Sequence, residues 1–194
     1  MKKLLSLLCL LASIAAFAQD KPEGLFINSK APDFRLKDQN DEFVSLKDLR
    51  KKGPVVVMFY RGYWCPFCNR ELKNFQDSLQ LIKDKGATLV AITPETTTGI
   101  DSTIGRTGAT FSLLSDQDGK LASEYQVAFK VDDRTVSRYK MAGIDLLKNN
   151  NQKEALLPVP AVYIVNKEGS VTYRFFDENY KKRVSVAEIL KNIK

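Results

Sequence analysis

The sequence predicts an α/β protein, in which buried strands alternate with amphipathic helices along the chain. Two apolar runs, residues 55–60 and 87–92, have the composition of strands that are buried on both faces. Between them, residues 66–85 carry apolar side chains at helical spacing. This β/α alternation is the basis of the predicted fold class.

The first elements lie before and after the apolar run at residues 55–60. Residues 33–36 and 42–45 alternate apolar with polar side chains around a polar turn at 38–41, which predicts an N-terminal β-hairpin. Gly53-Pro54 then precedes the strand over 55–60. The following helix ends at Gly86, and Pro94 closes the second strand. Three shorter elements come next: a helix over 98–105, a strand over 111–114 and a helix over 120–125.

The last third of the chain is less regular before it returns to strands. Residues 131–157 contain apolar side chains that could line a helix, namely Val136, Tyr139, Ile144, Leu146 and Leu147. Residues 161–165 and 171–175 predict a hairpin. Ser185 and Glu188 form the pattern of a capping box for a final helix.

The composition excludes several kinds of active site. The 194 residues include no histidine, so the chain cannot hold a Ser-His-Asp triad, a Cys-His pair or a histidine metal site. Hydrophobic residues make up 44% and charged residues 27%, which is ordinary for a soluble protein. The length predicts a single domain over residues 19–194.

Residues 1–18 have the pattern of a secretory signal peptide. A positive start, Met1-Lys2-Lys3, precedes an apolar run of 14 residues, and Ala16-Phe17-Ala18 fits the small-x-small cleavage pattern. Since about 20 apolar residues are needed to span a bilayer, an uncleaved anchor is the weaker alternative and we expect no stable membrane insertion. We therefore expect an exported, periplasmic or otherwise extracytoplasmic protein with no nucleic-acid partner. The short basic runs at 50–52 and 181–183 are flanked by acids and are interpreted as solvated.

Cleavage would also remove Cys9 and leave Cys65 and Cys68 as a Cys-x-x-Cys pair. The pair lies where a buried strand ends and a helix begins, with Pro66 at the first helical position. The free N–H groups of the first turn and the helix dipole favour a thiolate at Cys65. Cys68 lies one turn later on the same face, within disulfide range. We expect Cys65 to attack and the more buried Cys68 to resolve.

Three other uses of the cysteine pair fit the sequence less well. A structural disulfide that closes a four-residue loop stabilises little. A closed zinc site needs four ligands, and a copper-delivery site usually adds a histidine. We therefore expect neither a metal nor another cofactor.

Several motifs in order along the chain carry a family resemblance. They are Ala31-Pro32-Asp33-Phe34, the segment Val44 to Leu49, the segment Phe59 to Cys68, the segment Phe111 to Asp116 with Asp118-Gly119, and the segment Pro160 to Val165. On these motifs, residues 31–130 and 158–176 resemble the alkyl hydroperoxide reductase/thiol-specific antioxidant group, the peroxiredoxin-like proteins of the thioredoxin-like superfamily. The resemblance implies a thioredoxin-like fold, with a central mixed sheet and helices on both faces. It also implies that Pro160 is a cis-proline beside the redox cysteines.

The cysteine site departs from the pattern of typical peroxiredoxins. Met58 stands where they have proline, Gly62 where they have Thr or Ser, and Pro160 where they have arginine. The motif at residues 64–68, with Glu71 after it, resembles periplasmic thioredoxin-like reductases instead. The flanking sequence is thus peroxiredoxin-like, and the site itself leans toward disulfide exchange.

Charged and aromatic residues near the pair are candidates for catalysis and docking. Arg61 could stabilise the thiolate and a developing peroxide oxyanion, or it could be a surface arginine at a strand end. Glu71 could accept a proton from Cys68, or it could be a solvent-facing acid in the first turns of the helix. The residues expected to shape the surface for substrate or partner are Tyr63, Trp64, Pro66, Phe67 and Pro160.

These residues predict two alternative enzyme mechanisms, and the third alternative is a protein without catalytic activity. In the first, a thiol-dependent antioxidant peroxidase reduces hydroperoxides through a Cys65/Cys68 dithiol–disulfide cycle, and a thioredoxin-like or other thiol reductant restores it. In the second, an exported thiol:disulfide oxidoreductase acts on disulfides of client proteins. The third is a non-catalytic thiol-binding or metal-binding module. A second copy of the chain is a candidate partner, and residues 131–157 could form a lid or a dimer contact.

Overall fold

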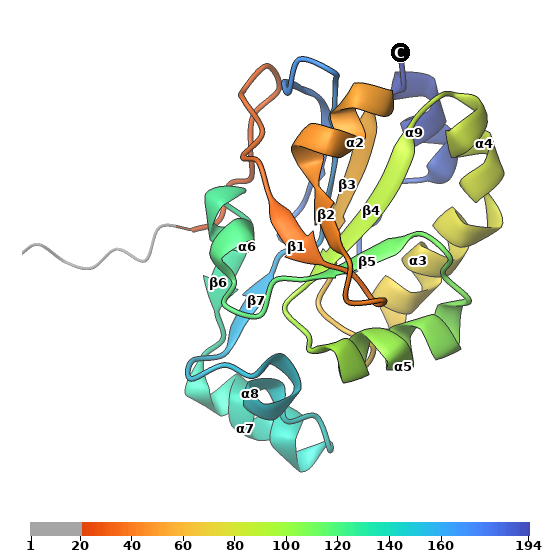
Figure 1. Cartoon of the computed structure of the whole chain (residues 1–194). Coiled ribbons are helices and arrows are strands. Elements are labelled where there is room, and N and C mark those ends of the chain that lie inside the picture. Colours follow the sequence, from red (N-terminus) through yellow and green to blue (C-terminus); the bar gives the residue numbers. More distant parts are fainter. Residues whose placement is uncertain (1–20) are drawn as a thin grey trace, which may run out of the picture.

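A computed structural model describes residues 21–194 and places a five-stranded mixed sheet at the centre of the molecule (Figure 1). The strand order is β5-β4-β3-β8-β9. β4 lies parallel to β3 and β5, whereas β8 lies antiparallel to β3 and β9. The strands are β3 (Val55–Phe59), β4 (Thr88–Thr93), β5 (Ser112–Ser115), β8 (Ala161–Val165) and β9 (Val171–Phe176). The predicted strands are therefore present, with ends that differ by one residue.

Helices cover both faces of this sheet, which confirms the predicted layers. On one face, side chains such as Val56 and Met58 pack with apolar residues of four helices. These are α3 (Pro66–Asp77), α4 (Leu79–Asp84), α5 (Thr97–Thr107) and α9 (Val186–Asn192). On the other face, Val55 and Val57 pack against α2 (Leu46–Lys52) and α6 (Lys120–Glu124). Because both faces are buried, β3 is apolar at every position.

Local signals explain several helix ends. The single helix predicted over residues 66–85 is broken at Ser78, whose backbone leaves the helical region (φ −110°, ψ 10°). Ser185 caps α9 as predicted, because its side chain accepts the Glu188 N–H at 3.2 Å. Helix α2 was not predicted, although Ser45 caps it by accepting the Asp48 N–H.

Two small, two-stranded antiparallel sheets flank the central sheet. The first pairs β1 (Arg35–Lys37) with β2 (Phe43–Ser45), close to the predicted N-terminal hairpin. The second pairs β6 (Ala128–Lys130) with β7 (Leu156–Pro158) and was not predicted. Helices α7 (Asp133–Met141) and α8 (Leu146–Asn150) lie between β6 and β7 and form an appendage at the bottom of Figure 1. This appendage has a small core of its own: Val131, Leu146, Ala155 and Leu157.

The expected cis-proline at Pro160 is wrong, because no peptide bond in residues 21–194 is cis. After β7, the Val159 N–H continues the β6–β7 pairing by donating to the Val127 carbonyl at 2.8 Å. Pro160 is buried at the start of β8. Neither Val159 nor Pro160 lies in a turn, which is the usual setting of a cis-proline.

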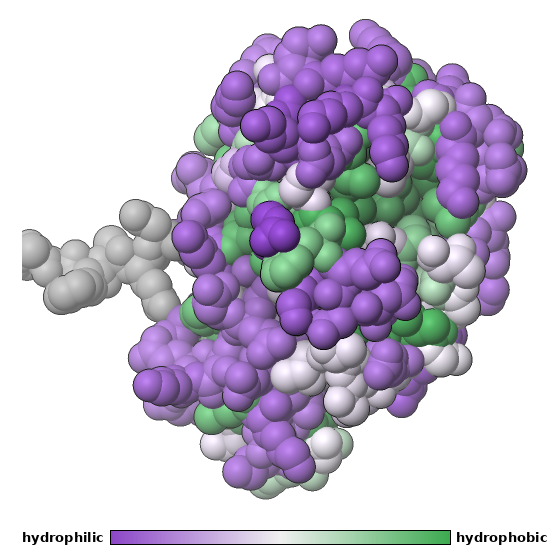
Figure 2. All heavy atoms as spheres, in the orientation of Figure 1, coloured by the Kyte–Doolittle hydropathy of each residue, from purple (hydrophilic) through white to green (hydrophobic). Residues whose placement is uncertain are grey.

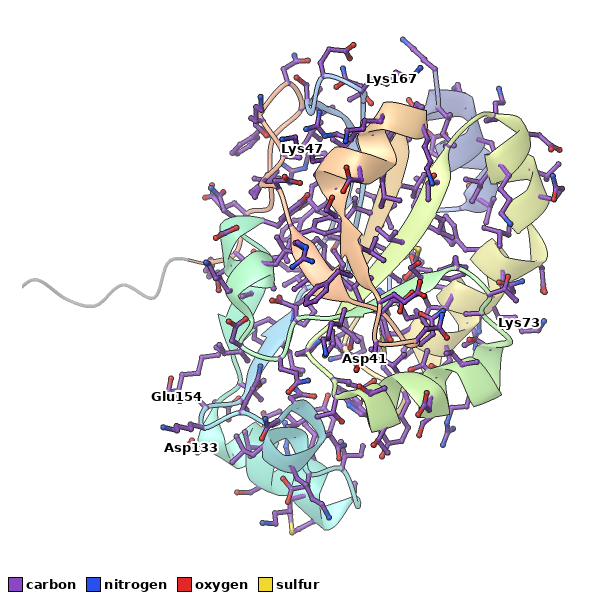
Figure 3. All side chains as sticks on the ribbon, viewed as in Figure 1. Asp41, Lys47, Lys73, Asp133, Glu154 and Lys167 are labelled. Atoms are coloured by element: carbon purple, nitrogen blue, oxygen red, sulfur yellow. A yellow bond between two sulfur atoms is a disulfide. The ribbon has the colours of Figure 1, made fainter. Side chains whose placement is uncertain are left out.

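Charged side chains lie mostly at the surface. Lys73 and Glu154 point outward in Figure 3, and each is in an exposed ion pair, with Asp77 and Lys130 respectively. Figure 2 shows hydrophilic residues over most of the visible face. Within residues 21–194, no helix is both long and apolar enough to cross a membrane. The predicted signal peptide, residues 1–18, lies outside the described residues and stays a prediction.

Candidate active site

The two cysteines lie at the N-terminus of α3, as the sequence predicts. Cys65 is the N-cap residue, and its Sγ accepts the Cys68 N–H at 3.3 Å. Pro66 occupies the first turn, where the missing N–H costs no helical hydrogen bond. The two cysteines form a disulfide, with their Cα atoms 5.3 Å apart. Loop 60–64, which links β3 to α3, therefore presents Cys65 to the positive end of a helix.

Both sulfurs are shielded from solvent in this oxidised form. Cys65 and Cys68 are each 0% exposed, so the expectation that Cys68 is the more buried of the two is wrong. Cys65 lies at the end of the helix and Cys68 lies within it. Both pack into the same apolar core, so both are fully covered. The two thiols are distinguished by the groups that contact them.

Arg61 contacts the first sulfur and is not a surface residue. It is 6% exposed, and its Nη2 donates to Cys65 Sγ at 3.6 Å. Its Nη1 lies 3.5 Å from the Tyr139 hydroxyl of α7. The guanidinium also stacks on the Tyr180 ring, 4.0 Å from the ring centroid. Arg61 is thus held in place to stabilise negative charge at Cys65.

Glu71 is buried beside the second sulfur, so the solvent-facing alternative is wrong. Its side chain is 4% exposed, and Oε2 lies 2.9 Å from Arg183 Nε in an ion pair that lacks an aligned hydrogen bond. Burial raises the pKa of Glu71 to about 7, against the opposing effect of the Arg183 charge. No hydrogen bond among residues 21–194 joins Glu71 to Cys68, so the geometry does not place Glu71 as a direct proton acceptor.

Arg183 makes the contact with Cys68 instead. Its Nη2 lies 3.6 Å from Cys68 Sγ, and its side chain is 14% exposed. The interpretation of residues 181–183 as a solvated basic run is therefore wrong at its third residue. No local signal marks this arginine, because its partner lies 115 residues earlier in the chain.

Aromatic side chains surround the pair on two sides. The Trp64 ring lies 5.0 Å from the Tyr139 ring, so the appendage packs against the active-site loop. Phe67 meets Tyr180 edge to face, with ring centroids 5.8 Å apart. Of the expected docking residues, Pro66 is exposed, Tyr63, Trp64 and Phe67 are half-buried, and Pro160 is buried.

A buried acid behind the loop was missed by the sequence reasoning. Glu95, just after β4, is 0% exposed, and its Oε2 accepts the Tyr63 N–H at 2.9 Å. Burial raises the pKa of Glu95 to about 8, with the Tyr63 N–H and the nearby Thr103 hydroxyl opposing the shift. Gly62, at φ +148°, leaves the space that this carboxyl occupies, since a Cβ there would lie 2.7 Å from Glu95 Cδ. Glu95 therefore anchors the loop that carries Arg61.

One shallow pocket of about 170 Å³ adjoins the pair on the Cys68 side. Its apolar wall includes Phe67, Phe75 and Val184. Its charged lining is Arg70, Lys181 and Arg183 with the carboxylate of Glu71. Among residues 21–194, no three His, Cys, Asp or Glu side chains are grouped closely enough to hold a metal ion.

Comparisons with known proteins agree with this geometry. The AhpC/TSA family matches residues 27–174. The chain is 29% identical over 171 residues to a putative peroxiredoxin bcp of Helicobacter pylori, covering 88% of this chain and 99% of that protein. It is 28% identical over 165 residues to the chloroplastic peroxiredoxin Q of Triticum aestivum, covering 85% of this chain and 65% of the relative.

Two further similarities concern a reductase and a solved structure. The chain is 24% identical over 169 residues to the thiol-disulfide oxidoreductase ResA of Bacillus anthracis, covering 87% of this chain and 79% of the relative. The crystal structure of the peroxidoxin BcpB of Mycobacterium tuberculosis superposes with a TM-score of 0.67 at 19% identity, covering 86% of this chain and 95% of that one. At this identity the superposition shows a common fold.

Proposed function

Because the chain belongs to the AhpC/TSA family and has the thioredoxin-like fold of its structural neighbours, we propose that it is a thiol-dependent peroxidase of the peroxiredoxin type. It reduces hydroperoxides through a dithiol–disulfide cycle of Cys65 and Cys68. One observation carries this assignment: the Cys65 sulfur caps a helix, contacts Arg61 at 3.6 Å and is bonded to a second cysteine. A nucleophile, its activating charge and its resolving thiol are thus in one place.

The first step consumes the peroxide at Cys65. The thiolate attacks one peroxide oxygen, an S–O bond forms and the O–O bond breaks. The sulfur is oxidised by two electrons, and the departing oxygen takes up a proton to leave as an alcohol, or as water from hydrogen peroxide. Arg61 and the Cys68 N–H stabilise the thiolate, and the guanidinium can also bind the developing oxyanion.

The remaining steps return the enzyme to its dithiol form. Cys68 attacks the Cys65 sulfenic acid, which forms the disulfide seen in the structure and releases water. Two thiols of an external reductant then exchange with this disulfide and become oxidised themselves. The half-buried aromatic residues Tyr63, Trp64 and Phe67 are proposed to form the surface on which the reductant docks.

A trapping experiment tests the assignment. The reduced Cys68→Ser variant is mixed with hydrogen peroxide and a dicarbonyl probe for sulfenic acids, followed by mass spectrometry. We expect one probe on Cys65, and rapid peroxide consumption by the wild-type protein with dithiothreitol as reductant. A wild-type rate no higher than that of free cysteine would refute the peroxidase. Cys65→Ser is the control that abolishes both signals.

A second candidate function is protein disulfide exchange. The motif at residues 64–68 and the similarity to the thiol-disulfide oxidoreductase ResA support it. In this reaction Cys65 attacks a client disulfide, and Cys68 then resolves the mixed disulfide. Rapid reduction of insulin by the reduced protein, together with slow peroxide turnover, would favour this function over the first.

We further propose that the protein acts outside the cytoplasm. The positive start, the apolar run at residues 4–17 and the Ala16-Phe17-Ala18 pattern support export. Expression of the full chain, cell fractionation and N-terminal sequencing test this proposal, and we expect a mature protein that begins at Gln19. A full-length chain in the cytosolic fraction would contradict it. The homodimer stays a prediction, which the molar mass in solution tests.

A further inference from the structure

We propose that Arg183 is a catalytic residue, which activates Cys68 as the resolving thiol in the way that Arg61 activates Cys65. This inference rests on the proposed peroxidase cycle, since resolution is a step of that cycle. It assigns a role in the chemistry to the segment between β9 and α9, which lies outside the matched family region.

Each sulfur of the pair has its own guanidinium. Arg61 Nη2 lies 3.6 Å from Cys65 Sγ, and Arg183 Nη2 lies 3.6 Å from Cys68 Sγ. The two sulfurs differ in their other donors, because Cys65 Sγ also accepts the Cys68 N–H. Among residues 21–194, Arg183 is the one donor to Cys68 Sγ. A negative charge on Cys68 therefore depends on this arginine.

The Arg183 guanidinium is held in a fixed position. Its Nε lies 2.9 Å from Glu71 Oε2, and its Nη1 donates to the carbonyl oxygens of Lys182, at 2.9 Å, and of Tyr180. Little of the side chain is exposed, so solvent screens its charge weakly. Because these contacts already order the side chain, little rotamer freedom remains to be lost when a thiolate forms. Glu71 is thus a positioning residue that acts through Arg183.

This contact matters at the step that forms the disulfide. Cys68 must lose its proton, which balances the proton taken up by the departing hydroxide, and its thiolate then attacks the sulfur of the Cys65 sulfenic acid. The S–S bond forms as the S–O bond breaks, and hydroxide leaves and takes up a proton as water. The peroxide has already supplied the oxidation, so no further oxidant is needed. A cation beside Cys68 favours its thiolate, which is the nucleophilic form.

The charged groups near Cys68 come from three segments. Glu71 is on the same helix, Arg61 is on the active-site loop, and Arg183 is on the segment before α9. Arg70 is also on α3 but is exposed and makes no hydrogen bond to either sulfur in the described chain. Arg70 therefore provides a matched control, since its substitution removes an equal charge without removing the sulfur contact.

Rapid mixing of the reduced protein with hydrogen peroxide separates the two steps. Trp64, the one tryptophan of the chain, lies in the active-site loop next to Cys65 and reports both steps by fluorescence. The first phase depends on peroxide concentration, and the second, resolution, does not. For Arg183→Met we expect the second phase to slow at least about tenfold more than the first, the equivalent of one pH unit in thiol acidity. Arg70→Met should keep the wild-type ratio, and Arg183→Lys should recover part of the loss.

A titration gives a second readout that does not depend on peroxide. Thiolate absorbance near 240 nm follows Cys68 alone in a background that carries both Cys9→Ser and Cys65→Ser. Adding Arg183→Met should raise the pKa of Cys68 by about one pH unit or more. An unchanged Cys68 titration, or a wild-type ratio of the two phases in Arg183→Met, would overturn the proposal. If the wild-type protein instead shows no peroxide-dependent phase, the peroxidase assignment fails, and the titration still decides the role of Arg183.

Discussion

Replacing Glu95 by glutamine should change how the stability of the protein depends on pH. Glu95 is fully buried and has a pKa of about 8, raised by burial from 4.5. The folded state therefore retains a proton that the unfolded state releases between these two pH values. Because the unfolded state binds fewer protons in this window, the free energy of unfolding falls as the pH rises through it.

The size of the effect follows from the same two pKa values. One protonation site changes the free energy of unfolding by at most about 1.4 kcal/mol per pH unit. From pH 4.5 to pH 8, the wild-type protein should therefore lose on the order of 4 kcal/mol through Glu95. Glu95→Gln keeps a carbonyl oxygen for the Tyr63 N–H but does not titrate. Its stability should match the wild type near pH 5 and exceed it by several kcal/mol above pH 8.

Urea unfolding of both oxidised proteins at pH 5, 6, 7 and 8.5 would measure this difference. Burial also raises the pKa values of Glu71 and Asp116, but both residues are present in both proteins, so the difference reports Glu95. Glu168→Gln, at an exposed acid, is the control and should leave the pH profile unchanged. A constant difference between wild type and Glu95→Gln across the pH range would refute the reasoning.

Three further predictions concern single contacts. Arg61→Met should slow oxidation by peroxide about 10- to 100-fold, because the developing oxyanion loses its donor; an unchanged second-order rate would contradict this role. Gly62→Ala should lower the free energy of unfolding by about 1–3 kcal/mol, since φ is +148° and the new Cβ would lie 2.7 Å from Glu95 Cδ. Tyr163→Phe removes the acceptor of the Leu25 N–H, 3.2 Å away, and should cost about 1–2 kcal/mol of stability. Urea unfolding measures both losses, and either variant at wild-type stability would show that its contact is not stabilising.

Local patterns predicted the parts of the structure that depend on local physics. The apolar run at 55–60 became the central strand β3, and the Cys65-Pro66 sequence placed the first cysteine at a helix N-cap. A strand buried on both faces is recognised by an unbroken apolar run, and a helix start is recognised by the residues next to it. Both signals lie within a few positions of the chain.

The missed features depend on contacts between distant residues. Arg183 meets Cys68 across 115 residues, and Glu95 meets Tyr63 across 32. The pairing of β6 with β7 was also missed, and these strands are three residues each. Strands this short carry weak hydrophobic periodicity, so the sequence gives little sign of them.

The location of Arg183 also affects when the protein becomes functional during synthesis. The strand, helix and loop that carry the cysteines are made in the first half of the chain, whereas Tyr180, Arg183 and α9 are made last. Ile189 and Ile193 of this last segment pack into the core that contains both cysteines. A nascent chain therefore contains both thiols before it contains the arginine that contacts Cys68. The two-cysteine reaction becomes efficient only after the C-terminal segment has docked, so its onset marks the completion of folding.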